Sequence, residues 1–127
     1  MLIKYFILFF GLLFISTILA HGPKEIDLEF NTETKILKIS IAHNVRNPNE
    51  HYIDEVEVLL NDETVVVQTL SMQTNKDGLE LIYIITDAKP GDTIEVKASC
   101  NKFGRKKGEI EVKKKVAKEE KSKDGSE

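Results

Sequence analysis

The sequence predicts an all-β domain, and three observations support this. Apolar and polar residues alternate along several short segments, as in strands that bury one face. Polar clusters separate these segments, and Pro90-Gly91-Asp92 is a strong turn signal among them. No convincing helical pattern lies between the segments. The seven predicted strands are residues 25–31, 35–43, 52–60, 64–70, 79–86, 93–100 and 109–113.

Seven short alternating strands within about 90 residues are typical of an immunoglobulin-like β-sandwich. The alternation also predicts which side chains face the core. His43 and Cys100 each continue the inward phase at the end of a strand. Ile53 is out of phase with Val56, which indicates a bulge or a strand start near Asp54. The predicted inward apolar residues are Ile26, Leu28, Phe30, Leu37, Ile39, Ile41, Val56, Val58, Leu60, Ile94, Val96, Ala98, Ile110 and Val112.

Residues 1–20 are predicted to be a secretory signal peptide. Lys4 is their only charged residue, an apolar run follows, and Ala20 suits the last position before cleavage. An uncleaved anchor is the alternative, although the apolar run is short for a span of about 20 residues. We therefore expect an exported protein, periplasmic or secreted, with no stable membrane span after cleavage. Residues 21–112 would form the sandwich domain, and residues 113–127 a charged, solvated tail.

Charge and cysteine content limit the classes of function. The net charge is −3, and loss of Lys4 with the signal peptide would make it more negative by one. This balance gives no support for nucleic-acid binding. The sole cysteine, Cys100, cannot form an internal disulfide. In an exported protein it would be an unpaired buried thiol, half of an intermolecular bridge, or a metal thiolate.

Residues 43–53, HNVRNPNEHYI, place two of the three histidines at the ends of a loop between predicted strands. Imidazoles that converge across a loop can bind a metal ion. Cleavage after Ala20 would make the third histidine the first residue, so that its α-amine and imidazole could chelate one metal together. The alternative for that residue is a frayed terminus. The predicted metal ligands are His21, His43, His51 and Cys100.

Together with the segment IEVKASCNKFG at residues 94–104, this loop resembles the iron-binding domain of the desulfoferrodoxin and neelaredoxin family, the superoxide reductases. The resemblance implies an immunoglobulin-like sandwich with one mononuclear non-haem iron. It also implies that His43 and His51 correspond to the two loop histidines, Cys100 to the axial thiolate and Asn101 to the residue beside it. His21 matches the earliest histidine ligand by spacing alone.

The sequence departs from that family at two places. Phe103 occupies the position of the last histidine ligand, and the family's Glu-Lys pair before the first histidine has no counterpart if cleavage leaves His21 as the first residue. The chain is therefore one nitrogen short, and the α-amine of His21 is a candidate replacement. Three nitrogen ligands and a thiolate would also suit copper, or zinc in tetrahedral geometry.

Three functions remain open from the sequence. The first is an exported superoxide reductase-like enzyme that reduces superoxide to hydrogen peroxide with electrons from a donor protein. The second is an exported carrier or sensor of copper or zinc. The third is an immunoglobulin-like interaction module in which Cys100 only packs in the core and no metal binds.

Overall fold

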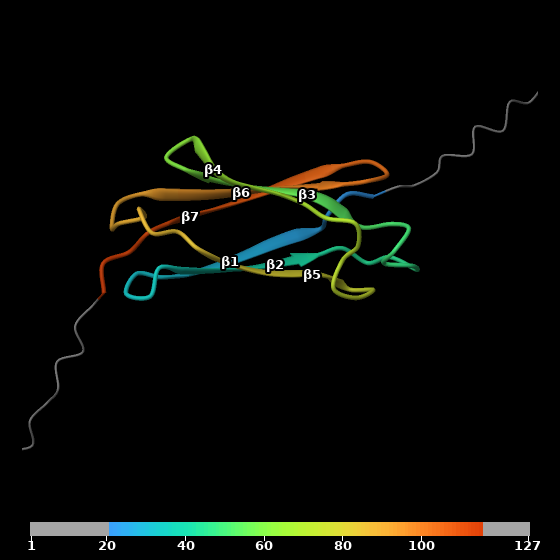
Figure 1. Cartoon of the computed structure of the whole chain (residues 1–127), viewed down its shortest axis with the longest axis horizontal. Helices are drawn as coiled ribbons and strands as arrows, with labels where there is room; N and C mark the ends of the chain where they lie inside the picture. Colours follow the sequence, from blue (N-terminus) through green and yellow to red (C-terminus); the bar gives the residue numbers. More distant parts are fainter. Residues whose placement is uncertain (1–20, 116–127) are drawn as a thin grey trace, which may run out of the picture.

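The computed structural model describes residues 21–115, which form seven β-strands in two antiparallel sheets (Figure 1). This confirms the predicted all-β sandwich, with three strands in one layer and four in the other. The predicted signal peptide and residues 116–127 of the predicted tail lie outside the described residues. Within residues 21–115, no helix is long and apolar enough to cross a membrane.

The first sheet has the strand order β1-β2-β5. Its strands are β1 (Glu25–Asn31), β2 (Ile36–Ala42) and β5 (Gly78–Ile84). β2 lies in the centre, where Ala42 pairs with Glu25 on one side and with Gly78 on the other. The end of β2 therefore lies beside the beginnings of β1 and β5, and this end of the sheet carries His43.

The second sheet has the order β4-β3-β6-β7. Its strands are β3 (Ile53–Leu60), β4 (Glu63–Thr69), β6 (Thr93–Cys100) and β7 (Arg105–Glu111). β3 and β6 form the centre and run antiparallel, so that the start of β3 lies beside the end of β6. This pairing brings His51, two residues before β3, next to Cys100.

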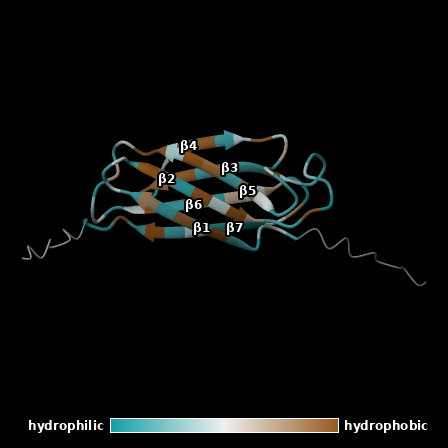
Figure 2. Ribbon diagram, turned by 90° about the horizontal axis from the view of Figure 1, so that it is seen from below, coloured by the Kyte–Doolittle hydropathy of each residue, from teal (hydrophilic) through white to brown (hydrophobic). Residues whose placement is uncertain are grey.

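The core lies between the sheets and follows the predicted phase. Apolar and polar residues alternate along the strands in Figure 2. The inward residues of β2 and β6 are fully buried, and His43 and Cys100 continue these buried rows. Full burial of a Val, Leu or Ile side chain contributes about 1.5–3 kcal/mol each. Partly buried side chains that pack against this core come from both sheets: Ile26, Leu28, Phe30, Leu60, Val66, Leu81, Tyr83 and Ile110.

A bulge interrupts β3 directly beside the predicted site. Ile53 pairs with Cys100 and Glu55 with Ser99, so Asp54 is an extra residue in the ladder. The irregularity predicted near Asp54 is thereby confirmed. Because a bulge changes the direction of its strand, this one sets the angle at which the preceding His51 approaches β6.

The prediction for the last strand was wrong at its start. β7 begins at Arg105 instead of residue 109, because Arg105 pairs with Ser99 after a turn at residues 101–104. The first three residues of β7 are all basic and all exposed. An edge strand with solvent on both faces needs no apolar alternation, so its first half carried no strand signal in the sequence.

Candidate metal centre

The four predicted ligand residues lie at one end of the sandwich. His43 directly follows β2, and Cys100 is the last residue of β6. His51 precedes β3, and His21 precedes β1. Antiparallel pairing of β1 with β2 and of β3 with β6 brings these four strand ends together, although they are far apart in the sequence.

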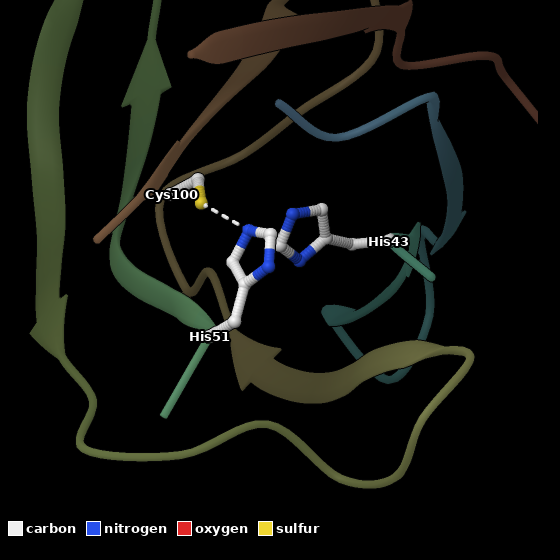
Figure 3. A group of neighbouring side chains, drawn as sticks. All are labelled: His43, His51 and Cys100. Atoms are coloured by element: carbon white, nitrogen blue, oxygen red, sulfur yellow. Dashed lines mark hydrogen bonds between the residues drawn. The ribbon is translucent and has the colours of Figure 1, made fainter. Parts of the chain in front are cut away.

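Three of these residues form a tight group. The potential ligand atoms of His43, His51 and Cys100 all lie within 4.8 Å of one another. Figure 3 shows the two imidazoles and the thiol converging, with His51 Nε2 3.1 Å from Cys100 Sγ. His43 is fully buried and Cys100 is 8% exposed. Three atoms of this type and spacing could hold one metal ion.

His21 lies at the open edge of this group. Its ring centroid is 5.8 Å from that of His43 and 5.8 Å from that of His51. The residue is exposed, and its backbone carbonyl oxygen lies 3.1 Å from His43 Nε2. The structure therefore brings His21 beside the other two histidines, but outside the tight group.

A contact between two glycine backbones holds the His21 segment at the site. Gly104 has a φ of +101° in the turn after Cys100, where glycine is favoured. A Cβ atom on Gly104 would lie only 2.6 Å from the Cα of Gly22. Glycine at 104 therefore lets the chain after His21 pass directly over the Cys100 turn.

The ring of His43 is oriented by Gln73, whose importance the sequence did not reveal. His43 Nδ1 lies 2.8 Å from Gln73 Oε1. The amide group of Gln73 donates from Nε2 to the carbonyl oxygens of His43 and Asn75, at 2.8 and 3.0 Å. These two bonds fix Oε1 toward the ring, so we infer that Nδ1 carries a proton and donates it. The other nitrogen, Nε2, is thus the one available as a ligand.

The surroundings of His43 Nε2 fit a cation. In the neutral ring Nε2 presents a lone pair, and the carbonyl oxygen of His21, which is also an acceptor, lies 3.1 Å from it. A metal ion on the Nε2 lone pair removes the conflict, and Gln73 then acts as the outer partner that ligand histidines usually have.

His51 is held by a second amide side chain. Asn101 Oδ1 accepts a hydrogen bond from the backbone N–H of Tyr52, and Asn101 Nδ2 donates to the carbonyl oxygen of Glu50, both at 2.9 Å. Asn101 therefore fixes the residues on both sides of His51. Since Asn101 also directly follows Cys100, it ties the two candidate ligand residues to each other.

Burial lowers the pKa of His51 from its ordinary value of 6.5, and the nearby His43, His21 and Lys102 lower it further. A lowered pKa favours the neutral imidazole, which is the form that binds metals. The thiol of Cys100 also has a backbone donor, because the N–H of Lys102 lies 3.4 Å from Sγ.

A surface hollow of about 520 Å³ opens beside the histidines. His21 and His51 form part of its lining, together with the cations Arg46 and Lys102 and the acid Glu50. A small molecule could therefore reach the group from solvent. On the other side of the site, Phe103 lines a second hollow beside Cys100, and its side chain is 74% exposed.

Comparison of the chain with known protein families, with curated proteins and with solved structures gives no significant match.

Proposed function

We propose that this protein binds a single transition-metal ion through His43, His51 and Cys100. One observation supports the proposal most directly. Two histidine nitrogens and one cysteine sulfur lie close together, and the side-chain amide of Gln73 binds Nδ1 of His43, which leaves Nε2 free to bind a metal. Magnesium and calcium prefer oxygen ligands, so this donor set suits iron, copper or zinc.

His21 is the proposed fourth ligand residue. Its ring lies at the open edge of the group, and cleavage after Ala20 would add a free α-amine at the same position. Because an α-amine has a pKa of about 7.7–8.0, a metal can displace its proton near neutral pH. This part of the proposal includes export, since it requires removal of residues 1–20.

We favour iron and a superoxide reductase-like activity, on the strength of the resemblance of residues 43–53 and 94–104 to that family. A bound ferrous ion would supply the electron that superoxide needs, with two protons, to become hydrogen peroxide. The chain itself would attract the anion, because Arg46 and Lys102 line the hollow that leads to His51. A donor protein would return the electron in each cycle.

A copper or zinc carrier is the second candidate, and Phe103 favours it. The exposed phenyl ring contributes no ligand, so the chain offers three histidines and one thiolate. Four ligands of this kind complete a tetrahedral site without an open position, as in a structural or storage site for zinc.

The test is metal analysis together with an optical spectrum. The protein is expressed with its own residues 1–20, and mass spectrometry identifies the N-terminal residue of the purified protein. We expect one metal ion per chain, and for iron or copper a thiolate-to-metal absorption band. Cys100→Ser should abolish the band and weaken binding by about 100-fold or more, beyond the usual effect of an outer-shell change. Ser99→Ala, on the opposite face of β6, is the matched control and should retain both. Protein that takes up no metal on titration would refute the proposal.

Stoichiometric iron and catalytic removal of superoxide would support the enzyme, whereas zinc or copper without turnover would support the carrier.

A separate variant tests His21. One extra residue before His21 in the mature protein should weaken binding about tenfold if the α-amine is a ligand, since it replaces an amine by an amide. Unchanged affinity would remove the amine from the site.

A further inference from the structure

The hairpin of β6 and β7 concentrates positive charge on a protein that is acidic as a whole. Residues 97–107 contain five cations and no acid, whereas the net charge of the chain is −3. All five cationic residues are exposed. They are Lys97, Lys102, Arg105, Lys106 and Lys107.

Phe103 stands among these cations at the turn of the hairpin. Its side chain is 74% exposed, the most exposed of the large apolar side chains in residues 21–115. The turn is held by a hydrogen bond from the N–H of Cys100 to the carbonyl oxygen of Gly104, at 3.0 Å. The hairpin tip, defined here as residues 101–106, therefore presents an aromatic ring between basic side chains.

Nearby acids leave the charge of the tip largely uncompensated. Glu95 lies 3.5 Å from Lys97 and 4.0 Å from Lys107, farther along the hairpin. Asp54 and Glu55 line the hollow next to Arg105. Among residues 21–115, no ion pair within 4.0 Å involves Lys102, Arg105 or Lys106.

The start of the described chain lies against the same tip. Gly22 contacts the backbone of Gly104, and Figure 1 shows the beginning of the chain beside the turn between β6 and β7. The first described residues, His21 and Gly22, therefore lie at the basic end of the sandwich. Lys113 and Lys114 lie at the other end, beyond the last residue of β7.

We propose that the hairpin tip docks on a membrane surface that contains anionic lipids, with Phe103 among the headgroups and acyl chain ends and the cations against lipid phosphates. Basic clusters bind anionic bilayers, and aromatic side chains favour the interface. A short turn offers too little area for a stable protein interface, which buries about 800 Å² on each partner.

The first experiment measures sedimentation with vesicles of phosphatidylcholine, with and without phosphatidylglycerol. The protein begins at residue 21 and thus contains all seven strands. We expect binding only to the anionic vesicles, and weaker binding as salt increases. The double variant Arg105→Glu with Lys106→Glu should lose at least about tenfold in affinity for these vesicles. Lys113→Glu with Lys114→Glu makes the same change in net charge at the other end, and should bind within about twofold of the unaltered protein.

The second experiment uses the absence of tryptophan from the sequence. Phe103→Trp places a single fluorescent reporter at the tip, and its emission should shift to shorter wavelength with anionic vesicles. Ile84→Trp is the matched reporter, because Ile84 is 68% exposed at the far end of β5. Its emission should not shift.

Three results would overturn the proposal: no binding to phosphatidylglycerol vesicles, equal losses in the two charge-reversed proteins, or equal shifts of the two reporters. The proposal would also be overturned if the protein bound polyglutamate beads but not vesicles, and if Arg105→Glu with Lys106→Glu abolished that binding. This result would indicate that the tip binds an acidic protein. None of these readouts depends on metal, so this inference and the metal site stand or fall separately.

Discussion

The two ends of the sandwich accommodate buried polar groups in opposite ways. At the end away from the histidines, the carboxylate of Asp92 accepts hydrogen bonds from Asn61 Nδ2 and from the backbone N–H of Lys89, at 3.0 and 2.9 Å. Asn61 Oδ1 in turn accepts from the N–H of Thr93. Each contact in this network joins a donor to an acceptor, so the network is complete without any further group.

At the histidine end, the buried ring of His43 lies between two acceptors, Gln73 Oε1 and the carbonyl oxygen of His21. His51 and Cys100 add two more potential ligand atoms to the same small volume. Burial of polar groups therefore does not by itself indicate a functional site. A complete network stabilises the fold, whereas a surplus of acceptors around one point indicates a place for a cation.

Among the changes that distinguish the two ends, Gln73→Leu should have the largest effect. The change would leave the Nδ1–H of His43 and the carbonyl oxygen of His43 without their buried partners. We expect a loss of about 2–3 kcal/mol in the free energy of unfolding, measured by urea denaturation of the metal-free protein. Metal affinity should fall about 10–100-fold, because the ring would no longer be oriented.

Gln68→Leu is the matched control for that change. Gln68 accepts a hydrogen bond from the hydroxyl of Tyr83 on a half-buried surface, away from the histidines. Water can replace such a partner, so metal affinity should be unchanged and the loss of stability should stay below about 1 kcal/mol. Equal effects of the two changes on metal affinity would contradict the role assigned to Gln73.

At the opposite end, Asp92→Asn should change how stability depends on pH. The hydrogen bond from Asn61 lowers the pKa of Asp92 from its ordinary value of 3.8, and the backbone N–H of Lys89 lowers it further. The carboxylate therefore stabilises the fold above pH 3.8, and this contribution is lost as the pH falls through the lower pKa of the folded protein. The difference between Asp92→Asn and the unaltered protein should be largest near neutral pH and shrink in acid. A difference that is constant with pH would exclude this origin.

The histidine end should respond at higher pH than the Asp92 end. Because the pKa of His51 is lowered from 6.5, the unfolded chain binds more protons at this residue than the folded protein does. The metal-free protein should therefore lose stability as the pH falls from 6.5 through the lower folded pKa. His51→Gln should remove this part of the pH dependence and leave the part below pH 3.8 intact. Unfolding curves between pH 3 and pH 8 in the presence of a chelator would separate the two ranges.

Much of the fold could be predicted because strand signals are local. The bounds of β1 and β6 agree with the predicted residues 25–31 and 93–100. The inward phase of His43 and Cys100 could also be predicted, because successive side chains in a strand alternate between its faces. β7 could be located only in part, since its basic first half follows no alternation and is defined by its pairing with β6.

For the candidate site, too, some features could be predicted from the sequence and others could not. The candidate ligand types and the strand ends that carry them could be predicted from the sequence, because alternation and turn residues act over a few neighbours. Two contacts could not be predicted in this way. Gln73 from the loop before β5 reaches His43, and Gly22 crosses Gly104, which brings His21 to the group. Neither contact has a periodic signature. Each depends on which loops meet when two sheets pack, and that is settled by the strand order of the whole domain.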